Sequence, residues 1–466
     1  MKSKITLLFA LQVICIFLGA ISPQLTYLFF AISIVNSIII GIKSNAHIGD
    51  SICISLIWLY VLQNLMIGLG AKIGQNTDPS IKLLTQIPSI TLIAICLISS
   101  IKNRVVRLNK ADKLFIIYLS LIISSLLFGR GSLQAIAMNI RNMTIFYFIY
   151  KIGKNYLNSQ NYISFYNKLM TCASIVLLIG VVLLIGGYDL YNAIGINEVY
   201  IAKGTAIRND ALDDRFYTSL ISTRLPRMGS LYYEPVNLAY FFLGTLLASI
   251  FSTKQIDKKN TILNSLGLTL TLGKGGILTT AIVLLFAWIV KKMKPFLYKT
   301  SVKRIAFVFS ILVISVGVIF SIAYYQKIGA ASSPHFWAVI KTWKNVISKP
   351  FGHGVGTGGN MSQVLNATNT KASYGSSWLA TGGESALMSF LYQIGIPAVI
   401  VLFLIMNELV PIDKKTSNYK IAIFWFLPIA LMSISILQDN TFTPQCVILP
   451  MIIIGYMSNS KEETYR

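Results

Sequence analysis

One long stretch of the chain carries positive charge and no acid. From Lys327 to Gly383 there is no Asp or Glu, whereas lysines occur at positions 327, 341, 344, 349 and 371. Glycines cluster in the middle of this stretch, at positions 352–359. Positive side chains beside backbone amides attract anions. We therefore predict that this stretch holds an anionic ligand near a membrane surface.

The glycine cluster leaves two interpretations open. The run GVGTGG that starts at Gly354 matches the pattern G-x-G-x-x-G. A dinucleotide site also needs a preceding strand, a following helix and an acid about 20 residues later. None of these is present, so we exclude that kind of site. The cluster is either a flexible turn or a nest of backbone amides for phosphate. The candidate substrate-binding residues here are Lys344, Gly352, His353, Gly354 and Gly356.

Glu384 comes directly after two glycines and opens an apolar helix. An acid in the first turn of a helix complements the helix dipole, which is one interpretation. A carboxylate beside a lysine-rich loop at the mouth of the membrane could instead accept a proton from a sugar hydroxyl. Glu384 is therefore a candidate catalytic base, and the structural alternative stays open.

Three further charged residues lie next to predicted helices. Arg227 and Glu234 bracket the entry to a predicted helix at 235–251, where Pro235 suits the first turn. They are either a flanking pair or a charge pair that lines a cleft. Lys274 lies between two apolar runs with almost no loop around it. It either snorkels to the membrane surface or holds phosphate.

Arg141 lies inside an apolar run, where a charge is costly in lipid. It must face the protein interior or water, and it could pair with another buried group or with a lipid phosphate. The three histidines are too scattered for a metal site, and no H-E-x-x-H or C-x-x-C motif occurs. We therefore predict neither a metal nor a cofactor.

The composition is that of a membrane protein. Of the 466 residues, 55% are hydrophobic and only 12% are charged, and the mean hydropathy is +0.67. A soluble domain carries about 25% charged residues. The net charge of +24 would suggest nucleic acid in a soluble protein, but the basic residues mostly lie in short loops between apolar runs. The positive-inside rule explains them there, so we exclude nucleic acid as a partner.

Because about 20 apolar residues cross a bilayer, the sequence predicts an all-α polytopic membrane protein with fourteen spans. They are 5–21, 25–42, 49–69, 83–101, 113–128, 133–150, 166–186, 235–251, 260–272, 275–290, 305–324, 384–407, 419–437 and 442–458. The lysines and arginines of the short loops place both termini in the cytoplasm. Two long loops, 187–234 and 325–383, then face outward from a single domain, 1–466.

The second outer loop contains an amphipathic pattern. Phe336, Ile340, Trp343 and Ile347 recur at helical spacing, with Val339 and Val346 beside them. We predict an amphipathic helix that lies along the membrane interface and ends near Pro350. A helix that only plugs the bundle is the alternative, because amphipathic spacing alone reports burial.

Four blocks of the sequence resemble the superfamily of O-antigen polymerases and O-antigen ligases. Segment 227–239 (RMGSLYYEPVNLA) is similar to the entry of that superfamily's central helix, and 268–278 (LTLTLGKGGIL) to its S-R-G-G turn. Segment 343–358 (WKNVISKPFGHGVGTG) is similar to its outer loop, and 383–397 (GESALMSFLYQIGIP) to the helix that follows. The blocks occur in family order and cover residues 227 to 400.

The departures from the pattern are informative. Lysines stand where the superfamily has arginines, namely Lys274 in the turn and Lys341 ahead of Gly352. Lysine keeps the charge but loses bidentate contact with phosphate. Ligases usually open the helix after the loop with His, whereas this chain has Glu384, which favours a polymerase.

The resemblance implies glycosyl transfer at the outer face of the bacterial inner (cytoplasmic) membrane, without nucleotide sugar, metal or cofactor. The donor would be a growing glycan on undecaprenyl pyrophosphate, and the acceptor a new lipid-linked repeat unit. In our hypothesis for the chemistry, Arg227, Lys274 and Lys341 neutralise the leaving pyrophosphate, and amides of the glycine cluster add hydrogen-bond donors. Glu384 orients or deprotonates the attacking hydroxyl. A chain-length regulator in the same membrane is also implied.

Two competing functions remain. An O-antigen ligase would use a lipid A-core acceptor. A flippase for lipid-linked oligosaccharides should carry charges along its helices through the bilayer, whereas here the intramembrane charge is mainly Arg141. The clustering of charge toward the outer face favours an enzyme.

Overall fold

The computed structural model describes residues 2–102, 108–129, 131–202, 216–220, 223–252, 256–292, 333–360, 362, 379–410 and 419–464. The chain divides into two compact units, and each is considered by itself. Unit 1 comprises Met1–Val106, Phe148–Ile277 and Gln445–Arg466, and unit 2 comprises Arg107–Tyr147 and Leu278–Pro444. The division falls within α6 (Leu133–Tyr156) and α11 (Lys274–Lys292), and it separates the first residue of α18 (Pro444–Thr464) from the rest of that helix.

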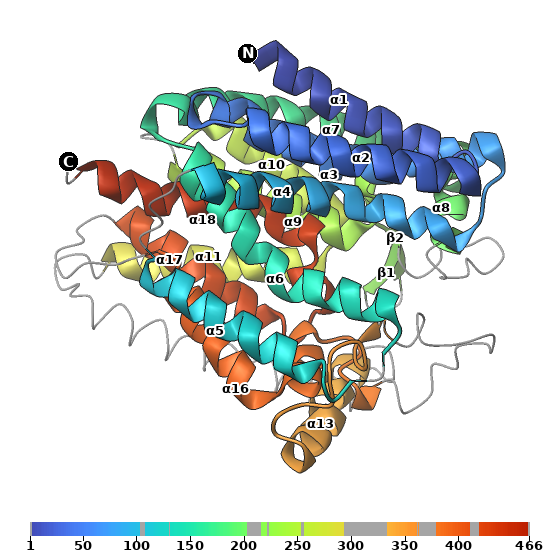
Figure 1. Ribbon diagram of the computed structural model, residues 1–466. Helices are drawn as coiled ribbons and strands as arrows, with labels where there is room; N and C mark the ends of the chain where they lie inside the picture. Colours follow the sequence, from blue (N-terminus) through green and yellow to red (C-terminus); the bar gives the residue numbers. More distant parts are fainter. Residues whose placement is uncertain are drawn as a thin grey trace. The chain divides into compact units, whose positions relative to one another are not determined.

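Unit 1 is built from long apolar helices that lie side by side (Figure 1). Its helices are α1 (Lys2–Gly19), α2 (Pro23–Lys43), α3 (Gly49–Gly74), α4 (Ile87–Lys102), α7 (Ser159–Ala193), α8 (Ile196–Ala202), α9 (Pro235–Leu247), α10 (Lys258–Thr271) and α18 (Pro444–Thr464). Short 3-10 turns precede α3 (η1, Ala46–Ile48), α4 (η2, Pro79–Gln86) and α9 (η3, Ser230–Tyr232), and a π-helical turn, η4 (Ala248–Ser252), follows α9.

Polar side chains inside unit 1 bond to each other across helices. Gln12 of α1 is fully buried and donates to the hydroxyls of Ser37 on α2 and Thr91 on α4, at 2.7 and 3.0 Å. Buried polar groups need such partners because water is absent. These bonds fix the packing of α1, α2 and α4 at defined positions along an otherwise apolar surface.

Unit 2 contains α5 (Lys110–Ser125), most of α6 and α11, α13 (Ser333–Ser348), α16 (Ala386–Glu408), α17 (Tyr419–Ile434) and the 3-10 turn η6 (Asp439–Phe442). Helices α5 and α16 pack along each other, and α13 packs on the N-terminal half of α16 (Figure 1). Val346 of α13 meets Met388 and Leu391 of α16 in a small apolar cluster.

The architecture confirms an all-α protein with several potential membrane spans. Within the described part of the chain, seven helices are long and apolar enough to cross a membrane, and three shorter helices are also apolar. The predicted span at 305–324 lies outside the described residues, as do residues 203–215 and 363–378 of the two predicted outer loops. A small antiparallel hairpin, β1 (Tyr217–Leu220) with β2 (Thr223–Pro226), was not predicted, because four-residue strands leave little pattern in a sequence.

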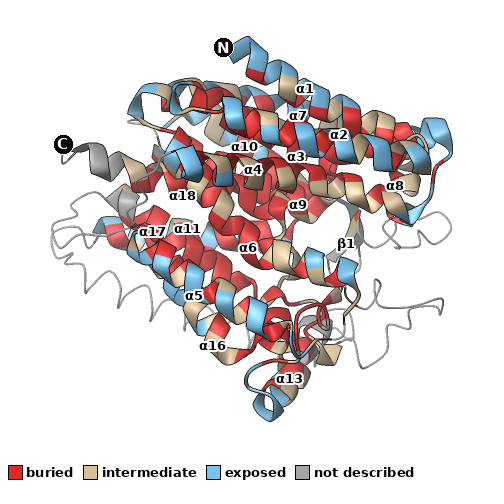
Figure 2. Ribbon diagram, viewed as in Figure 1, coloured by how far each residue is buried: buried red, intermediate tan, exposed pale blue. Residues whose placement is uncertain are grey.

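The predicted amphipathic helix is confirmed as α13, but its buried stripe differs from the prediction. Among its described side chains, Ala338, Thr342 and Val346 are buried, whereas Trp343 and Ile347 are 45% and 63% exposed. Figure 2 shows this exposed side of α13. The helix therefore has two apolar sides. One packs on α16, and the other, which contains part of the predicted stripe, is left uncovered by the described residues.

Candidate functional site

The structure distributes the candidate residues between the two units. Unit 1 contains Arg227, Glu234 and Lys274. The others belong to unit 2, namely Arg141, Lys341, Lys344, Gly352, His353, Gly354, Gly356 and Glu384.

The segment 227–234 of unit 1 is a turn inserted among buried helices. Its residues from Met228 to Tyr233 are buried, and the hydroxyl of Ser230 donates to the carbonyl of Val176 in the middle of α7 at 2.7 Å. Ser230 and Tyr233 both have a positive φ, of 45° and 53°. Such backbone is costly for residues with a side chain, and it persists where the surroundings impose it.

Side chains of neighbouring helices hold this turn by its carbonyl oxygens. Asn64 of α3 donates to the carbonyl of Tyr232 at 2.5 Å, and Tyr200 of α8 donates to that of Tyr233 at 2.5 Å. Irregular backbone can persist among apolar helices only when such partners satisfy it. The turn is therefore fixed in part by the uncharged side chains of Asn64 and Tyr200.

Arg227 and Glu234 interact electrostatically at the two ends of the turn. Arg227 Nε donates to the carbonyl of Thr271 at 3.2 Å, and the hydroxyl of Tyr200 lies 3.3 Å from Glu234 Oε2. Burial lowers the pKa of the Arg227 guanidinium, while the charge of Glu234 opposes that shift. An arginine stays charged in either case. Arg227 is thus a partly buried cation that interacts electrostatically with Glu234.

Lys274 is exposed and is the first residue of α11, three residues after the Thr271 that binds Arg227. The turn before it is tight. Leu272 has a φ of 46°, and the amide of Gly273 donates to the hydroxyl of Thr271 at 3.1 Å. Gly273 and Gly276 lie against Ala239 of α9, where an added Cβ would come within 2.4 and 2.7 Å of its methyl group. Close packing on α9 therefore places Lys274 at this turn.

In unit 2 the glycine-rich segment 351–360, hereafter the glycine loop, packs against the interior through its backbone. The amides of His353 and Gly354 donate to the carbonyls of Tyr392 and Gln393 at 2.8 and 3.0 Å. The amides of Gly352, Gly356 and Gly359 are also hydrogen-bonded within the protein. These amides are used inside the protein, so the interpretation of the glycine cluster as a phosphate nest is wrong for them.

A break in α16 makes this packing possible. Gly395 has a φ of 77° and a ψ of 176° inside the helix, and Pro397 follows two residues later. The carbonyls of Tyr392 and Gln393 accept the loop amides, and the amide of Ile396 donates to the carbonyl of Pro350 at 2.8 Å. Proline lacks an amide and interrupts helical bonding. The loop replaces bonds that the break removes.

A buried polar network, which the sequence analysis missed, joins the loop to two helices. Gln393 is fully buried; its Oε1 accepts from the amide of Gly356 at 2.7 Å, and its Nε2 donates to Asn139 of α6 at 3.0 Å. Asn139 in turn donates to the hydroxyl of Ser362 at 2.9 Å. The available signal was a glutamine and an asparagine inside apolar runs, which need buried partners.

Glu384 lies outside the helix that it was expected to open. Helix α16 begins at Ala386, and Ser385 is its N-cap, whose hydroxyl accepts from the amide of Met388 at 3.2 Å. Glu384 is half-buried and has a φ of 66°. The interpretation as a first-turn acid is therefore wrong, because the residue precedes the cap in left-handed backbone that strains a side chain.

An asparagine connects Glu384 to a second acid. The amide of Glu384 donates to Asn360 Oδ1 at 3.2 Å, and Asn360 Nδ2 donates to Asp439 Oδ2 at 2.5 Å. Asp439 begins η6, and the sequence analysis did not single it out. Isolated polar residues in loops are common, so neither Asn360 nor Asp439 gave a usable signal.

Polar residues of α13 hold the approach to Glu384. The hydroxyl of Thr342 donates to the carbonyl of Leu379 at 3.0 Å, and Asn345 Nδ2 donates to that of Ala380 at 2.9 Å. Lys341 is half-buried and Lys344 is exposed on the same helix. The basic helix α13 is therefore hydrogen-bonded to the segment that leads to Glu384.

The two remaining candidates are held locally. The His353 ring stacks on Tyr392, with centroids 4.1 Å apart. Burial and the charge of Lys349 lower the pKa of His353 against the opposing effect of the Tyr392 carbonyl, so the ring is neutral at pH 7. The guanidinium of Arg141 donates to Asn142 Oδ1 at 3.1 and 3.2 Å, one residue along α6.

An apolar pocket of about 430 Å³ adjoins the glycine loop. Its lining residues are Leu121, Ser124 and Ser125 of α5, Phe128 shortly after that helix, Lys349–Gly352, Ile394 and Pro397. The break of α16 therefore forms part of its wall. Among the described lining residues, Lys349 is the one that carries a charge.

Among the described residues, no group of three or more His, Cys, Asp or Glu could hold a metal ion. The five cysteines are buried and free. Comparison with protein-family models, with curated proteins and with solved structures found no match to this chain.

Proposed function

We propose that this protein is a polysaccharide polymerase of the bacterial cytoplasmic membrane. It would transfer a growing glycan from undecaprenyl pyrophosphate to the next lipid-linked repeat unit, producing O-antigen, capsule or exopolysaccharide. Fourteen spans with both termini in the cytoplasm would place the loops 187–234 and 325–383 on the outer face. The seven long apolar helices support a multi-pass chain.

The strained backbone of Glu384 is the observation on which the proposal rests. Its backbone is held at a φ of 66°, where glycine is the favoured residue, and its amide is fixed by Asn360. Non-glycine residues in such backbone cluster at active sites, where the surroundings impose the geometry. The described lysines of the acid-free stretch precede it in the chain, with Lys341 and Lys344 on α13 and Lys349 directly after that helix.

The reaction would be a direct displacement with inversion. A hydroxyl of the acceptor sugar attacks the anomeric carbon of the donor, and its proton passes to Glu384. The bond between that carbon and the pyrophosphate oxygen breaks, and the electron pair leaves with the pyrophosphate. Lys341 would neutralise the developing charge, since fixed cations near a developing anion stabilise the transition state. His353, stacked and neutral, would shape the site rather than carry charge.

Arg227 and Lys274 give unit 1 a second place for an anionic group. The Arg227 side chain is fixed by its bond to Thr271, and Glu234 sets its surroundings. Both substrates of the proposed reaction carry a pyrophosphate, so a cationic site in each unit suits the chemistry. Arginine and lysine are both established phosphate binders.

The pocket beside the glycine loop suits the lipid part of a substrate. Its apolar α5 wall would contact the polyprenyl chain, while Lys349 would lie near the first phosphate. The exposed Trp343 and Ile347 of α13 would rest in the membrane interface, as amphipathic helices with tryptophan do. Membrane lipid would thus cover the side of α13 that the described protein leaves open.

A reconstituted assay tests the proposal. Purified protein in vesicles receives only the lipid-linked repeat unit, and the products are separated by size on a gel. A ladder of lipid-linked polymers is expected, and Glu384→Gln and Lys274→Ala should each reduce it strongly. Near-normal rates in both variants would contradict the assignment of these residues.

Other products would identify a different function. Transfer only to lipid A-core, with no ladder from the lipid-linked unit alone, would indicate a ligase. Movement of the unit across the vesicle membrane without new glycosidic bonds would indicate a flippase. A chain-length regulator, if added, should alter the length distribution of the ladder and leave the linkage unchanged.

A further inference from the structure

A basic pocket in unit 1 has no part in the proposed transfer chemistry. Its volume is about 710 Å³, and it lies at the ends of α1, α2, α4 and α6. Each of the first three helices contributes one lysine, namely Lys4, Lys43 and Lys102. The lining contains no Asp or Glu.

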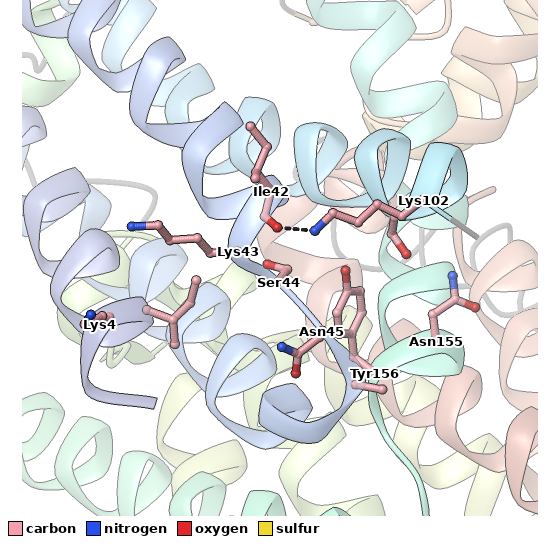
Figure 3. A pocket seen from close by; sticks show the side chains of 11 residues that line it. Lys4, Ile42, Lys43, Ser44, Asn45, Lys102, Asn155 and Tyr156 are labelled. Carbon is pink, nitrogen blue, oxygen red and sulfur yellow. Dashed lines mark hydrogen bonds between the residues drawn. The ribbon is translucent and has the colours of Figure 1, made fainter. Parts of the chain in front are cut away.

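Polar groups form the part of the pocket between the lysines. Figure 3 shows Lys4 and Lys43 on one side and Lys102 and Asn155 on the other, with Asn45 and Tyr156 between them. The buried Tyr156 phenol interacts with the hydroxyls of Ser99 and Ser44. These groups supply hydrogen bonds that suit oxygen atoms of a polar ligand.

The three lysines differ in how they are used. Lys102 Nζ donates to the carbonyl of Ile42 in the last turn of α2, so it also stabilises the end of that helix (Figure 3). The side-chain ammonium groups of Lys4 and Lys43 form no ion pair or hydrogen bond with any residue that the structure describes. Their charges are therefore available to a ligand.

The nearest acid along the chain does not offset these charges. Asp50 lies four residues after Ala46 of the pocket lining and is fully buried. Lys2 and Lys168 bind its carboxylate at 3.2 and 2.6 Å, and the hydroxyl of Ser164 donates to it at 2.7 Å. With two lysines on one carboxylate, the surroundings add positive charge to the pocket instead of removing it.

Apolar surface runs from the pocket along the helices that form it. Leu7 and Ile14 of α1 are 70% and 50% exposed, and Val35 and Ile42 of α2 are 59% and 54% exposed. Both helices are long and apolar enough to cross a membrane. Acyl chains would cover these surfaces, so the pocket lies at the level of lipid headgroups. A ligand that continues from the pocket along the helices needs an anionic head and apolar chains.

We propose that this pocket binds the phosphodiester headgroup of an anionic membrane phospholipid. Basic pockets between membrane helices bind such headgroups, and lysines near the surface each add about 1 kcal/mol. Lys4 and Lys43 bind the phosphate, while Asn45 and Asn155 contact the glycerol part of the head. The site is independent of the transfer reaction, because it uses none of the residues assigned to that chemistry.

Thermal unfolding of the purified full-length protein in neutral detergent tests the site. The probes are phosphatidylglycerol, phosphatidylcholine and inorganic phosphate, each added over a range of concentrations. Phosphatidylglycerol should raise the Tm with saturation, and the other two should not. For Lys4→Gln/Lys43→Gln the half-saturating concentration should rise about thirtyfold. The control Lys258→Gln/Lys259→Gln removes the same charge from exposed positions of α10 and should respond like the wild type.

Native mass spectrometry gives a readout that does not depend on unfolding. The wild type and the control should retain at least one more phosphatidylglycerol than the Lys4→Gln/Lys43→Gln variant. Equal retention and equal Tm shifts in all three proteins would overturn the proposal. An equal Tm increase with inorganic phosphate alone would overturn the lipid as the source and leave a free anion as the ligand.

Discussion

Two segments of this protein place irregular backbone among buried helices, and they are held in opposite ways. In unit 1, side chains hold the turn 227–234, since Asn64 and Tyr200 donate to its carbonyls. In unit 2, the backbone holds the glycine loop, whose amides bond to carbonyls released by the break at Gly395. The first arrangement depends on particular distant side chains, and the second depends on glycines that allow close approach.

The difference decides which residues remain for chemistry. In unit 1, Asn64 and Tyr200 hold the carbonyls of the turn, so changes at Arg227 and Glu234 should leave those two bonds in place. In unit 2, five amides of the loop are hydrogen-bonded inside the protein, and we propose that Glu384 and the lysines supply the charge. Substitutions of the charged residues should therefore lower activity with little effect on stability. Substitutions of the residues that hold the two segments should lower both.

The largest effect is expected at Glu384. Because a positioned base contributes about 10²–10⁴-fold, Glu384→Gln should slow glycan transfer by that factor. The unfolding temperature should change little, because the amide contact with Asn360 does not involve the side chain. Initial rates in the reconstituted assay and thermal unfolding measure the two quantities.

Glu384→Gly is the matched control for this position. Glycine lacks the carboxylate but adopts a φ of 66° without strain. It should be as slow as Glu384→Gln, and it should relieve the backbone strain at this position. Normal transfer by either variant would show that the carboxylate has no catalytic role.

A smaller loss is expected at Arg227 of unit 1. Removing one fixed donor to a developing anion costs about 10²–10³ in rate, so Arg227→Ala should fall in that range. Arg227→Lys keeps the charge but loses the Nε bond to Thr271, and it should lie between Ala and the wild type. Rates measured at saturating substrate decide this.

The control in the same unit is Lys72→Ala. Lys72 pairs with Glu198 at 3.3 Å and is partly exposed, so its ion pair contributes about 0–1 kcal/mol. Its rate should stay near normal. If Lys72→Ala lowers the rate as much as Arg227→Ala, the loss at Arg227 is an effect of general charge and not of position.

Stability should respond most at the glycine loop. An added Cβ at Gly354 would lie 2.1 Å from the Cα of Gly129, at a φ of 97°. Overpacking and backbone strain together should cost Gly354→Ala about 3 kcal/mol of unfolding free energy. Gly187→Ala is the control, since Gly187 has a φ of 56° with nothing within 4 Å of an added Cβ. It should lose only about 1–2 kcal/mol from strain, and equal losses would rule out close packing as the cause.

The two kinds of anchor can be compared through Gln393 and Asn64. Gln393→Leu leaves the Gly356 amide and the Asn139 side chain without this partner, at about 1–3 kcal/mol for each buried group. Asn64→Leu removes the bond to the carbonyl of Tyr232 and is expected to cost less. Denaturant unfolding of both variants checks the order. A larger loss for Asn64→Leu would mean that the turn in unit 1 is the more demanding of the two.

The positions of the helices could be predicted because the length and composition of an apolar run indicate a membrane helix. The predicted span 166–186 lies within α7, and its predicted end falls next to the kink at Gly187. The amphipathic spacing around Trp343 likewise gave α13. Local sequence encodes these features, because each depends on residues within one helix.

The site could be predicted less well, because it depends on contacts between distant segments. The use of the loop amides follows from the break at Gly395, about 40 residues away, and no local pattern near Gly354 encodes it. The sequence did place Glu384 beside two glycines, but its φ depends on Asn360 and on the cap at Ser385. Composition indicated the charge of the region, and tertiary contacts decide which groups remain available.

The smallest effect is a pH dependence that belongs to unit 2. The pKa of His353 is lowered in the folded protein, chiefly by burial, so below about pH 6.5 the unfolded chain binds a proton that the folded chain does not. Stability from this group is therefore present above about pH 6.5 and is lost as the pH falls through the folded pKa. In thermal unfolding over a pH series, His353→Gln should show a weaker fall in Tm on acidification than the wild type. A fall of the same size in both proteins would assign the pH dependence to another group, and the stacked ring on Tyr392 would then contribute packing alone.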